Sequence, residues 1–282
     1  MQHNFVEMFT STTTSILTEE TIHKFQNEGA VVLRGIFSPY WIQTVQKGIK
    51  KNLQNPSKYA QWLKTSESSG VYFNDYCNWK RISEFTEYIE KSPAAEIAAR
   101  LTQSKEVRFF HEHVLEKSPG TEKQTPWHQD QPYYPINGSQ VCSIWMPVDS
   151  IPFESSLQLI SGSHKWNRWF KPRMFATLED YDVTGESQNY ESLNVDEMSK
   201  YPVLQWAVEP GDCVVFHMLT VHGAAGNTSM SNHRRVLATR WLGDDVYLNN
   251  RPWQVSPPLE AVFSEPSNPS LEELPLAWTE GD

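Results

Sequence analysis

The sequence predicts a mainly β protein whose N-terminal third forms helices that wrap a β core. Five short strand-like segments, at 107–117, 141–149, 157–160, 213–216 and 235–242, are separated by turns rich in proline, glycine and asparagine. Helical spacing of apolar residues is confined to the part before residue 101, which argues against an alternating βα architecture. Many short strands between turns are typical of a sandwich or a jelly roll.

Three helices are predicted in the N-terminal third. The first begins after Thr18, whose hydroxyl can cap it, and ends at Gly29. Serine followed by proline, a pair typical of a helix start, occurs at 38–39 and again at 92–93. Apolar side chains follow the three starts at helical spacing: Ile22 and Phe25; Ile42, Val45, Ile49 and Leu53; Ile97 and Leu101. A short buried strand is expected at 30–33. We expect these elements to support a sheet and to carry no chemistry.

Alternation along the longer strands predicts which side chains share a face. In 107–117 one face would hold Val107, Phe109, His111, His113 and Leu115, and the other Arg108, Phe110, Glu112 and Val114. In 141–149, Ser143, Trp145 and Pro147 would lie opposite Cys142, Ile144, Met146 and Val148. The aromatic and amide-rich segment 71–79 is either an edge strand with a loop or one wall of a substrate pocket, with Asn74 as a polar contact.

Two segments lack a helical or strand period. Segment 166–205 opens with aromatic and basic residues, including Trp166 and Arg168, which suits either a lid over an anionic substrate or a solvated surface loop. Segment 249–282 is acidic and rich in proline, and we expect a tail that drapes over the domain or is disordered. We predict one domain over 1–282, with a helical wrapping at 1–106 and a core at 107–243 that 166–205 interrupts.

The composition excludes several classes of partner. The 282 residues carry a net charge of -10 with no basic run, which argues against nucleic acid and anionic membranes. No apolar run reaches the length of a membrane span, and residues 1–20 lack the features of a secretory leader. The three cysteines lack C-x-x-C spacing, and Cys142 and Cys213 lie in apolar runs as core residues would. We expect a cytoplasmic protein with a small-molecule substrate. The sequence carries no signal of oligomeric state.

A possible metal site lies in residues 127–134, which read WHQDQPYY. His128 and Asp130 are two apart, so on an extended chain their side chains point to the same side. A third ligand would complete the 2-His-1-carboxylate arrangement that non-heme Fe(II) favours. The H-x-D pattern alone is weak, because it occurs by chance in many chains.

Residues 211–241 offer the third ligand and a partner for an anion. His222 precedes Gly-Ala-Ala-Gly, which would let the backbone approach a bound ligand, whereas His217 fits a hydrogen-bonded core histidine. An arginine that enters a buried strand needs an anionic partner, and a carboxylate matches its planar fork. Arg234 and Arg240 would share a face of that strand, and Arg235 would point away.

Several motifs together resemble the phytanoyl-CoA dioxygenase family, including its ectoine-hydroxylase-like bacterial branch. They are TPWHQDQPYY at 125–134, SIW at 143–145, LISGSHKW at 159–166, HGA at 222–224 and RRVLATRW at 234–241. They occur in family order and cover about residues 107–243. The spacing from the distal histidine to the arginine pair is one residue longer than is common in the family, and Ser155-Ser156 replaces its usual Asn-Gly.

The resemblance implies a double-stranded β-helix (jelly-roll, cupin-like) core that uses Fe(II), O2 and 2-oxoglutarate. It implies that His128, Asp130 and His222 bind iron and that Arg234 binds the far carboxylate of 2-oxoglutarate, with Arg235 as the fallback. Trp145 and His113 match positions that line the cosubstrate pocket. Independently of the resemblance, we expect the substrate to contact Asn74, Gln131, Tyr133, Trp166 and Arg168.

The main functional hypothesis is a dioxygenase that hydroxylates an unactivated C–H bond of a small metabolite, with succinate and CO2 as coproducts. Asp130 argues against halogenation, because related halogenases carry a small residue at this position. No basic patch suited to CoA is present, which favours a small polar or amphipathic substrate. The alternatives are a cupin-like isomerase or lyase that uses Zn(II) or Mn(II) without O2, and a non-enzymatic metal or ligand sensor.

Overall fold

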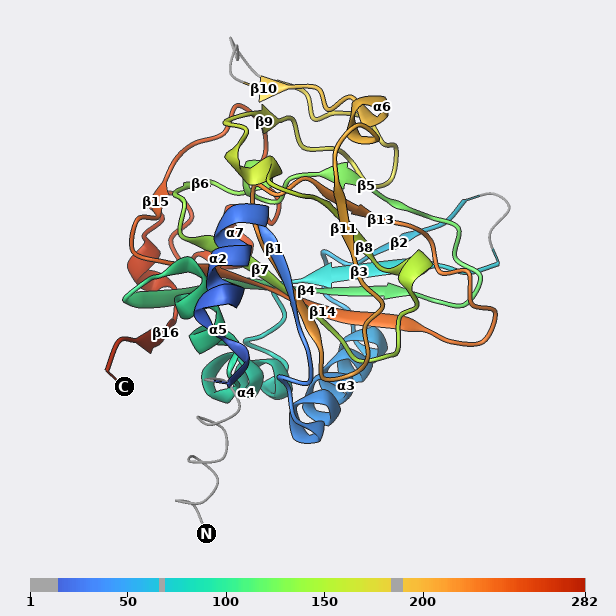
Figure 1. The fold of residues 1–282 in the computed structure, drawn as a ribbon, viewed down its shortest axis with the longest axis horizontal. Helices are drawn as coiled ribbons and strands as arrows, with labels where there is room; N and C mark the ends of the chain where they lie inside the picture. Colours follow the sequence, from blue (N-terminus) through green and yellow to red (C-terminus); the bar gives the residue numbers. More distant parts are fainter. Residues whose placement is uncertain (1–14, 66–68, 184–189, 282) are drawn as a thin grey trace.

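Two antiparallel sheets pack face to face in the computed structural model, which describes residues 15–65, 69–183 and 190–281 (Figure 1). The large sheet contains, in spatial order, β1 (Ala30–Leu33), β12 (Cys213–His217), β7 (Val141–Pro147), β14 (Arg234–Leu242), β4 (Glu106–Lys117), β3 (Tyr72–Tyr76) and β2 (Gln61–Leu63). The small sheet contains β11 (Val203–Gln205), β8 (Leu157–Ile160), β13 (His222–Ala224) and β5 (Thr125–His128). The predicted mainly β fold, a double-stranded β-helix with N-terminal helices, is confirmed.

Side chains from both sheets form a shared apolar layer. The large sheet contributes Trp145, Val214, Val236 and Ala238, and the small sheet contributes Leu157, Leu159 and Ala224. Alternation along each strand sends every second side chain into this layer and the others to the opposite face. The faces predicted for 141–149 are confirmed, because Cys142, Ile144, Met146 and Val148 all belong to the core cluster on the other side of the large sheet.

Four helices cover that other side (Figure 1). They are α2 (Glu19–Glu28), α3 (Pro39–Gln54), α4 (Ser83–Lys91) and α5 (Ala94–Thr102). Three match the predicted helices, but at Ser38 the hydroxyl makes no capping hydrogen bond. The sequence reading missed α4, whose cap position Ile82 offers no hydroxyl, although Phe85, Tyr88 and Ile89 bury one face of it.

Gly29 ends α2 in the left-handed conformation, with φ of 79°. A Cβ atom here would collide with the His164 ring and would lie 2.6 Å from Thr220 Oγ1. Gly35 also has a positive φ, 59°, but a Cβ there meets no atom within 4 Å. We therefore expect Gly35→Ala to cost about 1 kcal/mol of unfolding free energy and Gly29→Ala about 1–3 kcal/mol more, measured by urea denaturation. Equal losses would show that backbone strain alone matters at Gly29.

A bulge in β4 changes which side chains of this strand share a face. Arg240 pairs with His111 and Trp241 pairs with Phe109, so the register shifts by one residue between them. Phe109 therefore packs against Trp241 and Trp79 on the helix-covered side, while His111 lines the cavity between the sheets. Our prediction that Phe109 and Val107 share a face with His111 is wrong, because the bulge reverses the alternation.

The segment predicted at 71–79 forms β3 inside the sheet. Strand β2, with Trp62 exposed at the sheet edge, pairs along its outer side. The interpretation of an edge strand is thus wrong, whereas Asn74 does line the cavity.

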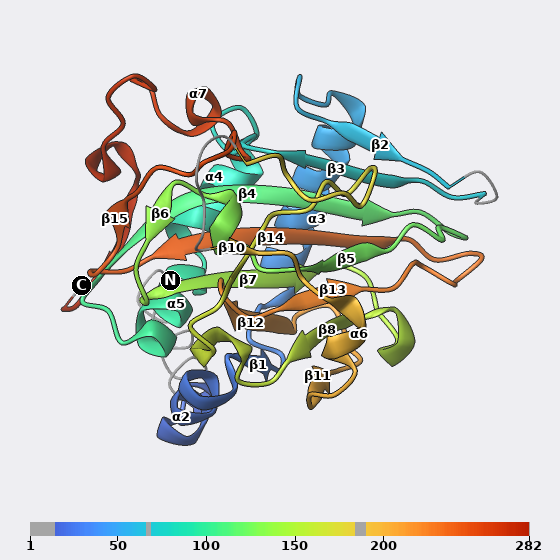
Figure 2. The ribbon, with the colours of Figure 1, turned by 90° about the horizontal axis from the view of Figure 1, so that it is seen from above.

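The two segments without a period contain short elements. Segment 166–205 includes β9 (Trp169–Phe170), β10 (Tyr190–Glu191), α6 (Val195–Met198) and β11, while residues 184–189 lie outside the described part. Towards the C-terminus lie β15 (Tyr247–Leu248), which pairs with β6 (Ile136–Asn137), then α7 (Leu259–Val262) and β16 (Leu276–Thr279). Strand β16 pairs with β4, so the described part of the tail packs on the domain, which is the first of the two expected alternatives. Figure 2 shows β4, β14 and β7 side by side, with β15 and α7 at one end of the molecule.

Two further expectations concern cysteines and membranes. Cys142 and Cys213 are buried in the core as expected, and both are free thiols. Within the described ranges, none of the helices combines the length and the apolar character that a membrane crossing requires. The expected lack of a leader concerns a stretch whose first 14 residues lie outside the described part.

Candidate metal and cosubstrate site

A cavity of about 810 Å³ lies between the two sheets. Its walls come from β2, β3, β4, β7, β12 and β14 of the large sheet, and from β5, β8 and β13 of the small sheet. The loop at 173–182 and the C-terminal segment at 253–260 also line it. Ligand cavities commonly measure about 300–1,000 Å³, so this one can hold a cosubstrate together with a second molecule.

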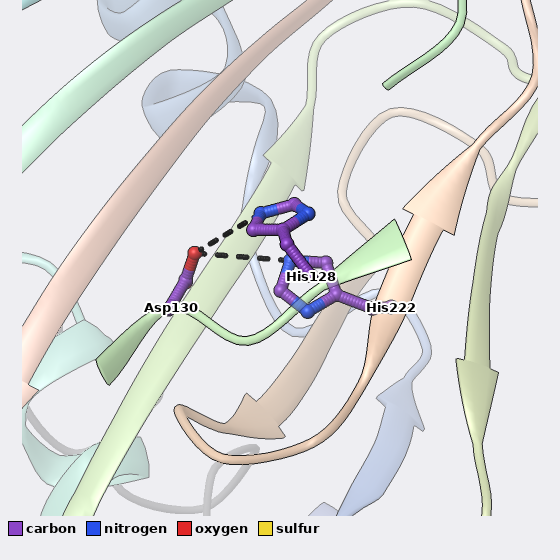
Figure 3. Close-up of side chains that lie close together, drawn as sticks. All are labelled: His128, Asp130 and His222. Carbon is purple, nitrogen blue, oxygen red and sulfur yellow. Dashed lines mark ion pairs between the residues drawn. The ribbon is translucent and has the colours of Figure 1, made fainter. Parts of the chain in front are cut away.

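His128, Asp130 and His222 meet inside this cavity, and all three are buried (Figure 3). Asp130 Oδ1 lies 3.5 Å from His128 Nε2 and 3.8 Å from His222 Nε2. Pairing of β5 with β13 sets His222 directly opposite His128. Asp130 reaches the cluster differently from our prediction, because β5 ends at His128 and Asp130 has helical torsion angles, φ −72° and ψ −45°. A turn, and not strand alternation, brings the carboxylate to the imidazoles.

Backbone carbonyls orient both imidazole rings. Pro126 O lies 2.7 Å from His128 Nδ1, and Thr220 O lies 2.9 Å from His222 Nδ1. A carbonyl only accepts, so each Nδ1 donates its proton and each Nε2 keeps a lone pair directed at the cluster. Burial, together with the neighbouring His128, lowers the pKa of His222 to about 3, so its ring is neutral. Neutral rings held in this way are typical of metal-binding histidines.

Asp130 is held as an anion with one oxygen left for a metal. Its Oδ2 accepts hydrogen bonds from Ser143 Oγ at 2.6 Å and from Arg240 Nη2 at 3.3 Å. Burial acts to raise the pKa of Asp130, but the Arg240 charge and the histidines outweigh it and hold this pKa well below the usual range. Two imidazole lone pairs and one carboxylate oxygen on one side of an open cavity fit a non-heme Fe(II) ion.

A second part of the cavity carries two buried cations. Lys117 Nζ and Arg234 Nη1 both donate to Ala225 O, at 2.8 and 3.0 Å, and the two side chains are almost fully buried. Trp145 lies under the Arg234 guanidinium, 5.5 Å from the ring centroid. No carboxylate of the described residues forms an ion pair with either cation. Burial lowers the pKa of Arg234 to about 10. Uncompensated buried cations require an anion, which this part of the cavity can accept.

The choice between the two arginines at 234–235 follows from the geometry. Arg235 lies on the opposite face of β14, where its Nη2 and Asp149 Oδ1 are 2.6 Å apart. Arg234 alone of this pair lines the cavity. Sequence reasoning missed Lys117, although the alternation that assigned His113 to the cavity face extends to Lys117 four residues later.

The other predicted site residues divide into two groups. The cavity wall includes His113, Trp145, Asn74 and Tyr133, whereas Gln131, Trp166 and Arg168 do not line it. Arg168 instead pairs with Glu191 and Glu197, and Trp166 packs on Tyr201. Gln131 is buried and donates to Gly138 O. We therefore remove these three residues from the candidate substrate contacts.

Two expectations about the loop around His222 have different outcomes. His217 is a hydrogen-bonded core histidine as expected, with Nε2 2.9 Å from Ser139 O. The glycines after His222 lie close to backbone atoms of the protein, whereas we expected them to let a ligand approach. A Cβ at Gly223 would lie 3.1 Å from Thr125 O, and one at Gly226 would collide with Thr121 O. The glycines thus let β13 and its loop pack against the neighbouring backbone.

The fold and the site define a class: a double-stranded β-helix with a His-x-Asp pair, a distal histidine and a buried cationic pocket, the combination found in 2-oxoglutarate-dependent non-heme iron oxygenases. The family model described as phytanoyl-CoA dioxygenase (PhyH) matches residues 25–236. The chain therefore belongs to the phytanoyl-CoA dioxygenase family, whose members use Fe(II), O2 and 2-oxoglutarate.

Two phytanoyl-CoA dioxygenases are similar in sequence to this chain. A probable phytanoyl-CoA dioxygenase of Caenorhabditis elegans is 24% identical over 216 residues, 73% of this chain and 63% of the relative. The human peroxisomal phytanoyl-CoA dioxygenase is 24% identical over 241 residues, 83% of this chain and 64% of the relative. The chain thus spans a little under two thirds of the length of both.

Solved structures share the fold. The non-heme alpha-ketoglutarate-dependent carbocyclase SnoK from nogalamycin biosynthesis has a TM-score of 0.67 at 18% identity, covering 94% of each chain. EctD from S. alaskensis, solved with 2-oxoglutarate and 5-hydroxyectoine, has a TM-score of 0.63 at 16% identity, covering 86% of this chain and 81% of EctD.

Proposed function

We propose that the protein is an Fe(II)- and 2-oxoglutarate-dependent dioxygenase that hydroxylates a C–H bond of a small molecule. One observation carries this proposal: a 2-His-1-carboxylate cluster shares its cavity with two buried cations that form no ion pair with any described carboxylate. The cluster fits Fe(II), and the cations fit the distal carboxylate of 2-oxoglutarate. When bound, the iron and 2-oxoglutarate together supply the activation of O2 for oxidation of the substrate, with succinate and CO2 as coproducts.

The residues of the chain bind and orient the reactants. His128, Asp130 and His222 would hold the iron, and the Pro126 and Thr220 carbonyls keep both rings in the ligating tautomer. Arg234 and Lys117 would bind the distal carboxylate, with Trp145 beneath the guanidinium. Burial lowers the pKa of His113 to about 3, so this ring remains neutral and contributes hydrogen bonds without charge.

We also propose that the substrate is a small metabolite, that the chain forms one oxygenase domain, and that segment 166–205 acts as a lid. EctD, a fold neighbour, was solved with the small molecule 5-hydroxyectoine bound, which supports a small-molecule substrate. Residues 173–182 of the segment line the cavity, which supports the role of a lid. The three free cysteines support a reducing location such as the cytoplasm.

The test needs no knowledge of the substrate. Fe(II) and 2-oxoglutarate are added to the protein without oxygen, and the visible charge-transfer band of the chelated iron is recorded. We expect a band that requires both components and whose amplitude saturates with 2-oxoglutarate. Absence of the band with both components saturating would refute the proposal. A cupin-like isomerase or lyase would instead show metal-dependent turnover without 2-oxoglutarate.

A second prediction concerns the pH dependence of 2-oxoglutarate binding and rests on Lys117. Burial and then the neighbouring Arg234 hold the pKa of Lys117 well below its usual range in the ligand-free cavity. A bound carboxylate favours the protonated amine and raises this pKa again, so binding takes up a proton. Affinity for 2-oxoglutarate is therefore highest below the ligand-free pKa of Lys117 and falls, by up to about tenfold per pH unit, as the pH rises above it.

Titration of the band with 2-oxoglutarate between about pH 6.5 and pH 9.5 measures this dependence, since both carboxyl groups of 2-oxoglutarate remain ionised there. Lys117→Met should bind 2-oxoglutarate more weakly and without the slope. Lys123→Met removes a nearby amine that does not line the cavity, so the slope should persist. A slope that survives in Lys117→Met would assign the proton to another group.

A further inference from the structure

The proposed function leaves one part of the cavity wall unassigned, which we call the outer part. Aromatic rings form much of its wall: Tyr59, Tyr76, Tyr133, Tyr134, Tyr181 and Trp253. Tyr59 and Tyr76 stack with their centroids 5.3 Å apart, and Tyr76 meets the edge of the His113 ring at 5.5 Å. Flat aromatic walls bind ring-shaped ligands through stacking and C–H contacts.

Two buried polar atoms on this wall have no partner. Asn74 Oδ1 lies 3.2 Å from His113 Nε2, which donates to it, but no described residue is within hydrogen-bond distance of Asn74 Nδ2. His111 Nδ1 donates to the Glu112 carbonyl at 3.3 Å, so its Nε2 keeps a lone pair, and this atom also lacks a described partner. Asn74 is 4% exposed and His111 is 2% exposed. Buried polar atoms normally have hydrogen-bond partners. We therefore expect a ligand to bind the donor Asn74 Nδ2 and the acceptor His111 Nε2.

The charges of the outer part exclude an anionic ligand. Arg240 is paired with Asp130, and Arg173 with Asp180. Burial lowers the pKa of His111 well below its usual range, so its ring is neutral. Two exposed carboxylates, Asp182 and Glu260, lie at the cavity mouth. Apart from Lys117 and Arg234, no described cation that lines the cavity is left for a carboxylate or phosphate of the ligand.

We propose that the substrate is an uncharged ring compound that carries a hydroxyl group, and not a CoA thioester or a carboxylic acid. This inference rests on the proposed function. The substrate hydroxyl accepts from Asn74 Nδ2 or donates to His111 Nε2, and its ring packs against Tyr59, Tyr76 and Trp253. The same contacts reject an acyl-CoA, because its phosphates would meet the carboxylates at the mouth.

The test uses two probes of one skeleton that differ in charge and a third probe that is a CoA thioester. Phenyl β-D-glucoside is uncharged, phenyl β-D-glucuronide is its carboxylate, and lauroyl-CoA represents the thioesters. Each is titrated by calorimetry into the protein loaded with Fe(II) and 2-oxoglutarate without oxygen. We expect the glucoside to bind at least about tenfold more tightly than the glucuronide and lauroyl-CoA to bind most weakly, because a buried carboxylate without a partner is strongly disfavoured.

The variant Asn74→Leu, of similar volume, should weaken the glucoside about tenfold, as expected for loss of a buried hydrogen bond. Gln54→Leu removes an exposed amide at the end of α3 that does not line the cavity, and it should leave glucoside binding unchanged. If Asn74→Leu does not fold, His111→Phe removes the proposed acceptor and should weaken the glucoside in the same way. Tighter binding of the glucuronide or lauroyl-CoA, or no glucoside binding below about 1 mM, would overturn the inference. The charge-transfer band is recorded in every sample, so its loss would point to failure of the proposed function instead.

Discussion

His222→Ala is expected to remove the charge-transfer band of the protein with Fe(II) and 2-oxoglutarate and to abolish succinate formation. The variant loses one of two neutral imidazole ligands, while His128 and Asp130 remain. Loss of a group that only orients a ligand costs about 10–100-fold in metal affinity, so loss of a ligand should cost at least about 100-fold. Iron titration followed at the band, and succinate release in air, measure the two effects.

His217→Gln is the matched control, since His217 is a buried histidine five residues away that lies outside the cluster. Its ring bonds the Ser139 carbonyl and accepts from Leu219 N, so its replacement should lower stability and leave the band intact. A band that persists in His222→Ala and disappears in His217→Gln would show that His217, and not His222, is the iron ligand. An intact band in both variants would argue that neither histidine binds iron.

The sequence could predict the candidate metal cluster because local motifs specify its three residues. His128 and Asp130 are two residues apart, and the small residues after His222 distinguish it from His217. The strand pattern of the core was also readable, since alternation of Ser143 and Trp145 with the apolar residues between them requires no tertiary information. The extended chain on which this prediction rested nevertheless ends at His128, and Asp130 has helical torsion angles.

Features that depend on pairing between distant segments could not be predicted. The bulge opposite Arg240 and Trp241 arises between β4 and β14, which are more than 100 residues apart, and no local pattern announces it. Arg168 looked like an anion-binding residue because its partners Glu191 and Glu197 lie in a segment without a period. Strand β16 gains its structure only from the edge of β4. In each case a tertiary contact overrides the local signal.

Arg234→Leu is expected to weaken 2-oxoglutarate binding strongly while it leaves the ligand-free protein as stable as before or more so. Arg234 is buried and has no anionic partner among the described residues, and burial lowers its pKa to about 10, so the folded protein without ligand holds this charge at a cost. A leucine removes that cost. For 2-oxoglutarate the variant removes one of two cations facing the carboxylate, and loss of a buried charge partner costs about 2–5 kcal/mol, or about 30-fold to several thousandfold.

Thermal unfolding with and without 2-oxoglutarate measures both effects in the same sample. In the native protein with Fe(II), 2-oxoglutarate at about 100 times its Kd should add about 2.7 kcal/mol of stability. In Arg234→Leu this gain should vanish at the same concentration, although the ligand-free melting temperature does not fall. Arg235→Leu breaks the ion pair with Asp149 on the outer face of β14, so it should lose stability and keep the gain from 2-oxoglutarate. If Arg235→Leu loses the gain and Arg234→Leu keeps it, the carboxylate binds to the other face of the strand, and the cavity between the sheets is not the cosubstrate site.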